Sequence, residues 1–546
     1  MRCGVLAVLL LLVHPAALPA ATRFEQFTER FKSNPDQVSV VAATFFGGAG
    51  TEWFSTGGVQ PDGTIVAAGV SLGPVLASNG VPVKVLGQDA PAPAAPERIV
   101  RKNKKGEPEL NKDGTPRYDP FRWSHENATG FIVRYAPDLK SIVSISRFPW
   151  CAGSITGAAI DGEGHIYVTG SAGKTFGSLG KAEELKAGDA GEVKDPACLQ
   201  TYLAKLSPDA SQVLWLKRIQ APSCAPDVRI AKDGNLSFQG PDLRTFGPDG
   251  TPLNLTVVPG GLGNRVAVNP LDGTYARGGE HHWPTGREPW RCPTLNVYRP
   301  DGTWLYELYN WDGHYVGLDN LRLVSDSAVR AVRYDDQGNL IIYAWSDGGN
   351  SVMYREPNDV RREAKAFKGL GMSAWGAGVL SCAYVIKIET KNFKVAGGTL
   401  WLAYLKEKDK PNSIWIDALG FADDGSVCFA GRSAWGLIQT GQHLNGDGEP
   451  AGPYVAVLSP DCSSLRFSSA IAACGKTDVA NGETWGIAGG TAKDRRRILF
   501  FTGAEEKENV YDKVRSAPTL NAVQGTFGGG PTDAYLLVLD GSPTAK

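Results

Sequence analysis

The sequence predicts an all-β protein, and three observations support this prediction. The first is a repeated hairpin in which a strand of small residues, an Asp-Gly turn and a β-rich strand follow one another. The second is a partner hairpin, often with Pro-Asp at its turn, that comes after the first. The third is the glycine content of 66 in 546 residues, about 12 % against ~7 % in average proteins. Glycine provides the positive φ that tight hairpin turns require.

The first hairpin occurs seven times, as in "GAAIDGEGHIYVTG" at 157–170. Asp-Gly between two apolar runs is the strongest short-range hairpin signal. The seven copies are at 57–69, 157–170, 227–240, 265–279, 331–345, 417–431 and, in degraded form, 485–503. The partner hairpins are at 130–146, 201–218, 242–258, 294–310, 383–405 and 454–472.

Four antiparallel strands per unit, repeated around an axis, predict a seven-bladed β-propeller. The seventh unit ends with "AYLLVLDG" and supplies only one strand of its second hairpin. We expect the missing outer strand to be the first strand of the domain, at about 38–48, paired with the last strand at about 534–540. This pairing would close the ring and leave no free edge there.

The domain organisation follows from the two ends of the chain. Arg2, an apolar run from Val5 to Val13 and small residues up to Ala20 predict a signal peptide over 1–20. A short amphipathic segment is expected at 21–37, and a single propeller at 38–542 with a long loop insertion at 71–129 in blade 1. A short helix is expected at 358–367. These features predict a secreted, periplasmic or cell-surface protein with no membrane span.

The connections divide the propeller into two sides. If each blade runs A to D from the inside outward, the Asp-Gly turns join A to B and the Pro-Asp turns join C to D. These tight turns define the turn side. The long insertions join B to C on the opposite, loop side, at 71–129, 171–200, 280–293, 346–382, 432–453 and 504–533. Long loops in a compact domain are often functional, although decoration without a ligand remains the alternative.

Eight cysteines follow the predicted signal peptide. Six are placed on the loop side and are disulfide candidates, namely Cys151, Cys198, Cys224, Cys292, Cys382 and Cys474. An exported protein permits disulfides. We expect at least one among Cys151, Cys198 and Cys224, because these segments belong to blade 2 and its neighbour. Cys428 and Cys462 are expected inside a strand and a turn, as unpaired or structural residues.

Aromatic and polar residues near the loop-side mouth of the central channel are the candidate binding residues. They are Glu52, Trp53, Trp150, His281, His282, Trp283, Trp311, Trp415, Glu483 and Trp485. Tryptophan is a frequent anchor in binding sites, but packing between blades is the ordinary alternative for each residue. Glu52 and Glu483 could hold a cation at the mouth, although ordinary solvated acids are favoured.

Several chemistries have no sequence support. The chain has no G-x-S-x-G elbow, no H-E-x-x-H and no phosphate-binding loop. We therefore predict no cofactor, no metal and no assigned catalytic residue. Lys+Arg of 56 against Asp+Glu of 57 gives no indication of nucleic acid, and a monomer is expected.

Two stretches resemble a known family. "IDGEGHIYVTGSA" followed by "YLAKLSPDASQVLWL", and "VQGTFGGGPTDAYLLVL", are similar to the seven-bladed β-propeller repeats (SBBP-type) of secreted bacterial proteins. The likeness extends from about Val38 to Leu539 and is weakest in blades 3 and 4. The resemblance implies a propeller in an extracytoplasmic setting, and it implies no catalytic activity.

The sequence thus predicts a binding scaffold for protein or carbohydrate that uses its loop side. One alternative is an extracytoplasmic, carbohydrate-active hydrolase or lyase with its site at the same mouth. The other is a structural cell-surface protein. Whether the protein is an enzyme stays open, with a non-enzymatic role favoured.

Overall fold

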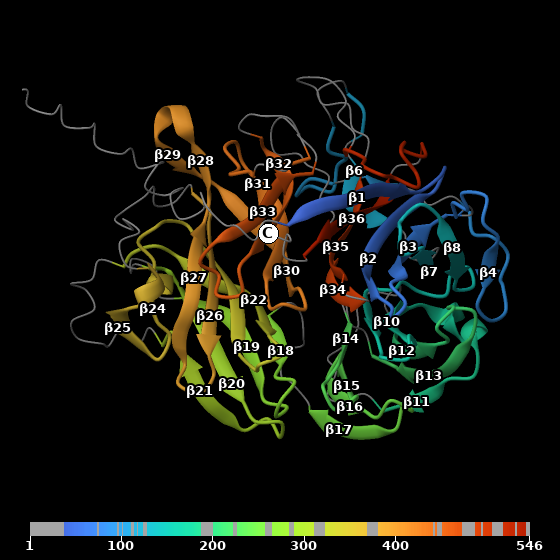
Figure 1. Cartoon of the computed structure of the whole chain (residues 1–546), viewed down its shortest axis with the longest axis horizontal. Coiled ribbons are helices and arrows are strands. Elements are labelled where there is room, and N and C mark those ends of the chain that lie inside the picture. Colours follow the sequence, from blue (N-terminus) through green and yellow to red (C-terminus); the bar gives the residue numbers. More distant parts are fainter. Residues whose placement is uncertain are drawn as a thin grey trace, which may run out of the picture.

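The computed structural model shows seven small antiparallel sheets arranged in a ring as a β-propeller (Figure 1). It describes residues 38–73, 76–94, 98–100, 102–110, 114–116, 118–123, 128–186, 200–221, 226–256, 265–282, 289–310, 323–367, 380–440, 443–444, 450–471, 486–492, 495–504, 517–529 and 532–541. The signal peptide and the amphipathic segment expected at 1–37 lie outside these residues. Among the described residues there is no α-helix, and none of the helical turns could cross a membrane.

Each blade is a four-stranded meander whose strands we give from the inside outward. Blade 1 consists of β2 (Thr51–Val59), β3 (Ile65–Leu72), β7 (Ala128–Tyr135) and β8 (Ile142–Arg147). Blade 2 consists of β9 (Gly157–Ile160), β10 (Ile166–Ala172), β12 (Gln200–Leu206) and β13 (Val213–Ile219). Blade 3 consists of β14 (Asp227–Ile230), β15 (Leu236–Gln239), β16 (Leu243–Phe246) and β17 (Pro252–Thr256).

The remaining blades follow the same plan. Blade 4 consists of β18 (Val266–Val268), β19 (Tyr275–His282), β20 (Arg291–Tyr298) and β21 (Trp304–Leu308). Blade 5 consists of β22 (Ser327–Tyr334), β23 (Leu340–Ser346), β26 (Cys382–Glu389) and β27 (Lys394–Trp401). Blade 6 consists of β30 (Ile414–Phe421), β31 (Val427–Ser433), β32 (Gly452–Leu458) and β33 (Leu465–Ala470). Blade 7 consists of β34 (Gly486–Ala492), β35 (Arg495–Ala504), β36 (Asp533–Asp540) and β1 (Ser39–Phe46).

Blade 7 confirms the predicted ring closure. β1, from the start of the domain, pairs antiparallel with β36, with Phe46 opposite Ala534 and Ser39 opposite Asp540. In Figure 1 the blue β1 lies beside the red β35 and β36. The ring of Phe46 stacks on those of Phe54 and Phe131 in blade 1, at centroid distances of 5.8 and 5.4 Å. The closing strand therefore joins blade 7 to blade 1 by packing as well as by backbone hydrogen bonds.

Shorter elements lie in the connections between the blade strands. They are β4 (Val83–Val85), β5 (Arg98–Val100), β6 (Tyr118–Trp123), β11 (Glu183–Leu185), β24 (Arg355–Glu356), β25 (Asp359–Glu363), β28 (Ala403–Leu405) and β29 (Lys410–Asn412). The 3₁₀ turns are η2 (Lys174–Leu179), η4 (Val352–Tyr354), η5 (Lys365–Phe367) and η6 (Lys406–Lys408).

The prediction of a helix at 358–367 is wrong. This segment forms β25, which pairs with β24, and then the turn η5. The side chains of Val360 and Phe367 are buried against blade 5, and Phe367 contacts the ring of Tyr384. Tertiary packing of these apolar side chains therefore prevails over the local helical preference.

The long B–C insertions cover the outer edges of their own blades. In blades 1 and 2 the insertion supplies a fifth strand, because β4 runs parallel to β8 and β11 runs parallel to β13. In blade 7, the backbone of Leu520 exchanges two hydrogen bonds with that of Ala43 on β1, at 2.9 and 3.0 Å. An unpaired edge strand is a site of aggregation, and these insertions cover it.

Blades 5 and 6 protect their outer strands with individual hydrogen bonds rather than with an added strand. In blade 5 the backbone N–H of Val395 on β27 donates to Glu356 at 2.9 Å. In blade 6 the backbone N–H of Thr440 donates to the carbonyl of Ser468 on β33 at 3.0 Å. Edge protection thus gives these insertions a structural role that requires no ligand.

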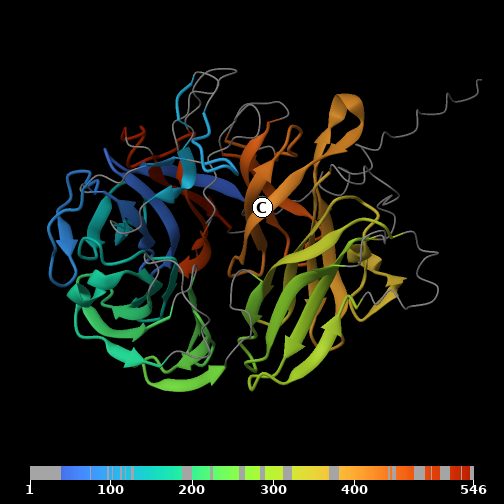
Figure 2. The ribbon, with the colours of Figure 1, turned by 180° about the vertical axis from the view of Figure 1, so that it is seen from behind.

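Blades 3 and 4 differ from the other five. The B–C connection of blade 3 is only 240–242, and no described segment pairs as a strand with β17 or β21. Their outer surface presents apolar side chains to solvent, namely Leu253, Leu255, Trp304 and Tyr306. Figure 2 shows these two blades side by side from behind. The rim of blades 3 and 4 is therefore the uncovered sector of the described ring.

Candidate ligand-binding surface at the channel mouth

The inner strands carry a shared irregularity that shapes the channel. In β2, β22 and β30 the register with the next strand shifts by one residue at the same level of the blade. The extra residues are Ser55, Arg330 and Asp417. Such a bulge re-aims a side chain and is often found beside functional sites. Two of the three residues are charged, although they lie between apolar neighbours of a buried strand.

Arg330 belongs to a group of charged and aromatic side chains at the loop-side end of blades 4 and 5. Its guanidinium pairs with Glu280 at 3.0 Å and lies 5.5 Å from the ring centroid of Trp345. Arg291 lies between two tryptophans, 4.9 Å from the ring centroid of Trp290 and 5.8 Å from that of Trp345. We call this group, completed by His282, the mouth cluster.

The outer part of the mouth cluster is open to solvent. Trp290 is 39 % exposed, and its ring meets the imidazole of His282 edge to face at 4.5 Å. The His282 side chain is 45 % exposed, and its Nε2 lies 3.9 Å from Glu280 Oε1. An exposed aromatic face beside cations is suited to stacking and charged hydrogen bonds with a ligand.

Burial and neighbouring charges both change the pKa of Arg330. Burial lowers the pKa of the Arg330 guanidinium below its ordinary value; Glu280 opposes this effect, and the like charges of Arg265 and Arg291 add to it. Arg265 and Arg291 are therefore near enough to Arg330 to repel its positive charge.

Blade 6 presents a related arrangement next to the mouth cluster. Asp417 accepts from Arg432, with Arg432 Nε 3.1 Å from Asp417 Oδ2. The Arg432 guanidinium lies 6.0 Å from the ring centroid of Trp415. Trp415 is half-buried, and its carbonyl accepts from the Tyr454 hydroxyl at 3.1 Å.

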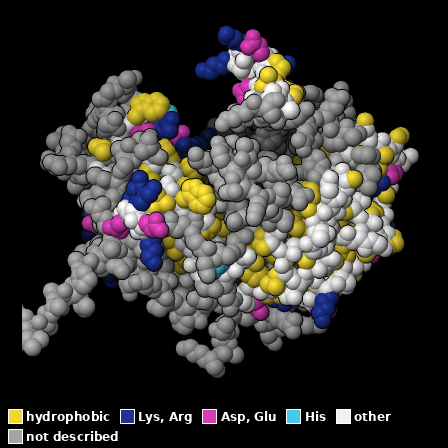
Figure 3. Space-filling model, turned by 90° about the horizontal axis from the view of Figure 1, so that it is seen from above, with side chains coloured by type: hydrophobic (Ala, Val, Ile, Leu, Met, Phe, Trp, Pro, Cys, Tyr) yellow, Lys and Arg dark blue, Asp and Glu magenta, His cyan; other side chains and the backbone are white. Residues whose placement is uncertain are grey.

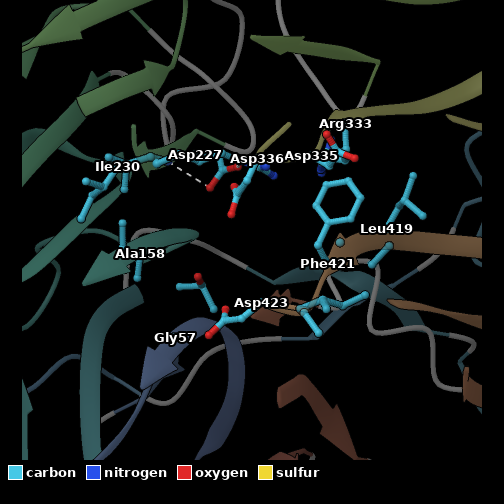
Figure 4. Close-up of a pocket in the computed structure, with 18 of the residues that line it drawn as sticks. Gly57, Ala158, Asp227, Ile230, Arg333, Asp335, Asp336, Leu419, Phe421 and Asp423 are labelled. Atoms are coloured by element: carbon cyan, nitrogen blue, oxygen red, sulfur yellow. Dashed lines mark hydrogen bonds and ion pairs between the residues drawn. The ribbon is translucent and has the colours of Figure 1, made fainter. Parts of the chain in front are cut away.

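Below the mouth, the channel contains a cavity of about 530 Å³. Its walls come from inner strands of blades 1, 2, 3, 5, 6 and 7, and it reaches the turn side at Asp336 and Asp423. Figure 4 shows Asp227 and Ile230 on one wall and Arg333, Leu419 and Phe421 on another. Burial, with repulsion from Arg229, lowers the pKa of Arg333 to about 10, and Asp227 opposes this shift.

Most acids of this cavity have a structural partner. Asp335 pairs with Lys387 at 2.9 Å, Asp424 with Arg466 at 2.6 Å, and Asp227 with Arg229 at 3.4 Å. The backbone N–H groups of Gln337 and Asn339 also donate to Asp335, at 2.9 and 2.8 Å. The aspartates of the A–B turns thus act first as turn-forming residues. Among the described residues, no group of three or more His, Cys, Asp or Glu side chains is placed to hold a metal ion.

The structure places the predicted tryptophans in different environments. Trp53 packs within its own blade against Val70, Leu72 and Ala128. Trp150 is buried beneath the Arg147 guanidinium, 4.1 Å from its ring centroid. Arg147 Nη1 in turn donates to Asp89 of the blade 1 insertion at 3.0 Å. These two tryptophans have packing partners, whereas Trp415 lies beside the mouth.

The remaining predicted site residues are only partly described. His281 is half-buried on β19 opposite Cys292, and His282 is exposed in the mouth cluster. Glu52 is fully buried beside blade 7. Trp283, Trp311, Glu483 and Trp485 lie outside the described residues.

Some of the cysteines proposed as disulfide candidates are described by the structure and others are not. No disulfide joins any two of the described cysteines, Cys151, Cys292, Cys382, Cys428 and Cys462. Cys198, Cys224 and Cys474 lie outside the described residues. Cys382 is fully buried, and burial raises the pKa of its thiol to about 12.

Sequence reasoning missed Trp290, Arg291, Arg330 and Trp345. Trp290 directly precedes β20, Arg291 is its first residue, Arg330 lies on β22 and Trp345 lies on β23. Residues that come together from different blades have no fixed spacing in the sequence, so no motif could reveal them. One signal was available for Arg330, because two charged residues, Arg330 and Arg333, interrupt the apolar inner strand "SAVRAVRY".

Comparisons with known proteins add the following. No family model matches the chain, and no curated protein matches it. A solved structure of a protein of unknown function from Dyadobacter fermentans DSM 18053 is 10 % identical, with 92 % of this chain and 99 % of that chain covered and a TM-score of 0.37.

Two further solved structures are similar at a comparable level. Kuenenia stuttgartiensis hydrazine synthase is 12 % identical over 61 % of this chain and 74 % of that chain, with a TM-score of 0.30. The Pan2 WD40 domain of Neurospora crassa is 11 % identical over 72 % of this chain and 90 % of that chain, with a TM-score of 0.29. The class of this protein, a seven-bladed β-propeller, therefore rests on its own sheet topology.

Proposed function

We propose that this protein is an extracytoplasmic binding scaffold that takes its ligand at the mouth cluster. The main observation in support is the exposed pair of Trp290 and His282 next to Arg291. The guanidinium of Arg291 lies near two tryptophan rings, those of Trp290 and Trp345. The propeller supplies a closed frame whose ends are joined by β1 and β36. The leader expected at 1–20 and the likeness to secreted bacterial propeller repeats support the extracytoplasmic setting.

A hydrolase or lyase at the same mouth receives less support. Such an enzyme commonly pairs a carboxylate with a carboxylic acid whose pKa is raised toward neutrality. Glu280 and Asp417 are each paired with an arginine. Among the described carboxyls, Glu52 has a pKa raised to about 8, but none of its surface is exposed.

A glycan array combined with an assay for released products tests the proposal. We expect the purified protein to retain a ligand without releasing cleaved product. Trp290→Ala should reduce the retention, because it removes the exposed stacking face. Trp304→Ala is the matched control, since Trp304 is 56 % exposed on the rim, outside the cluster.

Two results would overturn the proposal. One is release of product, which would identify an enzyme. The other is retention that Trp290→Ala leaves unchanged, which would place the ligand elsewhere.

A further inference from the structure

The balance of charge in the mouth cluster indicates what kind of ligand it binds. Two guanidinium groups, those of Arg291 and Arg330, lie there at 5.8 and 5.5 Å from the ring centroid of Trp345. Two carboxylates accompany them: Glu280 pairs with Arg330, and Asp326 accepts the backbone N–H of Arg291 at 3.0 Å. Arg291 and Arg330 thus present two guanidinium groups at the mouth, and Glu280 pairs with one of them, that of Arg330.

The side chain of Arg291 supports the same conclusion. Its Nε is buried and has no hydrogen-bond acceptor among the described residues. A buried donor left without an acceptor is destabilising, so an acceptor brought by a ligand would be favoured. Two tryptophan rings hold the guanidinium in place, which reduces the entropy lost when it binds.

The exposed aromatic side chains argue for sugar rings as the carriers of the negative charge. Trp290 is 39 % exposed beside the guanidinium of Arg291, and the imidazole of His282 meets its ring edge to face. An aromatic face packs well on the C–H face of a sugar ring, while guanidinium binds carboxylate or sulfate in a bidentate manner.

Nucleic acid is the less suitable polyanion for this protein. The chain has a formal net charge of −1. On the side of the molecule that Figure 3 shows from above, the basic and acidic side chains that are drawn lie in small mixed groups. A nucleic-acid surface usually has a broad basic stripe that follows the phosphates.

We propose that the mouth cluster binds an acidic polysaccharide, with Arg291 and Arg330 on its carboxylate or sulfate groups and Trp290 on a sugar ring. This inference rests on the proposed function and names the ligand class of the same site. Binding should weaken as salt is added, because part of it is electrostatic.

Affinity electrophoresis of the full chain tests the inference with polygalacturonate, chondroitin sulfate and neutral dextran as probes. We expect retardation by at least one acidic probe and none by dextran. Arg330→Gln and Arg291→Gln should each weaken binding about tenfold or more, as expected for a lost charged hydrogen bond. Arg361→Gln is the matched control, because this side chain is 66 % exposed on β25, outside the cluster. Thermal melts of every variant show whether it is folded.

The outcomes separate the two proposals. Binding of dextran that is lost in Trp290→Ala but kept in Arg330→Gln would overturn the acidic ligand and leave the binding scaffold standing. Binding of the acidic probes that neither arginine variant changes would also overturn the inference. If no acidic polysaccharide is retained and the glycan array finds an uncharged oligosaccharide whose binding depends on Trp290, the inference fails and the binding scaffold stands.

Discussion

Glu52 has none of its surface exposed, although it carries a carboxyl group on the innermost strand of blade 1. The hydroxyl of Ser71 donates to Glu52 Oε1 at 3.1 Å. Burial raises the pKa of Glu52 to about 8; the Ser71 hydrogen bond opposes this, and the nearby Asp533 carboxyl of blade 7 raises it further. A residue expected to be a solvated acid at the mouth is thus a buried acid at the junction of the first and last blades.

This burial predicts a pH dependence of stability. The pKa of Glu52 rises from 4.5 to about 8 on folding, so between these values the folded protein holds a proton that the unfolded chain has released. Each pH unit in this window should lower the free energy of unfolding by up to about 1.4 kcal/mol. Glu52→Gln should remove this slope. The free energy of unfolding of the variant should therefore increase relative to that of the wild type as pH rises from 5 to 8.

Urea unfolding at pH 5, 6, 7 and 8 measures the effect. Glu407→Gln, at an exposed position in η6, should keep the wild-type slope. An unchanged slope in Glu52→Gln would show that Glu52 does not titrate with a raised pKa in the folded protein.

The repeated elements are the level at which sequence reasoning worked best. Asp-Gly and Pro-Asp turns located the strand pairs, because a tight turn sets which residues face each other. The cover segments could not be predicted in the same way. β4 and β11 are three residues each, and only the exposed edge beside them gives them strand geometry. Arg291 and Trp345 likewise meet only because blades 4 and 5 are neighbours.

Thr440 tests the role of a cover segment. Its backbone N–H donates to the Ser468 carbonyl at 3.0 Å, and its hydroxyl accepts the Ser468 N–H at 3.1 Å. The Thr440 hydroxyl also donates to the Ser468 carbonyl at 3.2 Å. Thr440→Val removes both bonds of the hydroxyl and should cost about 1–3 kcal/mol, because a part-buried N–H loses its acceptor. Thr440→Pro removes the backbone bond as well, so it should cost more and increase aggregation.

Thermal melts and hydrogen exchange at Ser468 measure both variants. Faster exchange at Ser468 is expected in each, with the larger change for proline. Equal stability of wild type and Thr440→Pro would mean that the segment does not protect the edge of β33.

The whole molecule depends on joining two strands that lie almost 500 positions apart in the chain. β36 contributes a fully buried row of apolar residues to blade 7, from Ala534 to Leu539. It pairs with β35 on one side and with β1 on the other. Because β1 comes from the start of the domain, neither end can leave without opening an edge.

Deletion of 534–546 should therefore abolish the cooperative thermal transition and make the protein aggregate. Deletion of 542–546 is the matched control and should leave melting unchanged, since it spares β36. Circular dichroism melts and size-exclusion chromatography measure both proteins. A deletion of 534–546 that stays monomeric with wild-type melting would refute the closure.

Local sequence patterns are enough to predict the number of blades, the strand order, the ring closure and the side on which the long insertions emerge. These properties depend on turn residues and on alternating apolar residues, and both signals lie within short stretches of the sequence. The tertiary structure alone decided that most insertions cover edges, that Glu52 is buried, and that Trp290, Arg291, Arg330 and Trp345 form one surface. Contacts between residues far apart in the chain arise only when the sheets pack, so no local pattern encodes them.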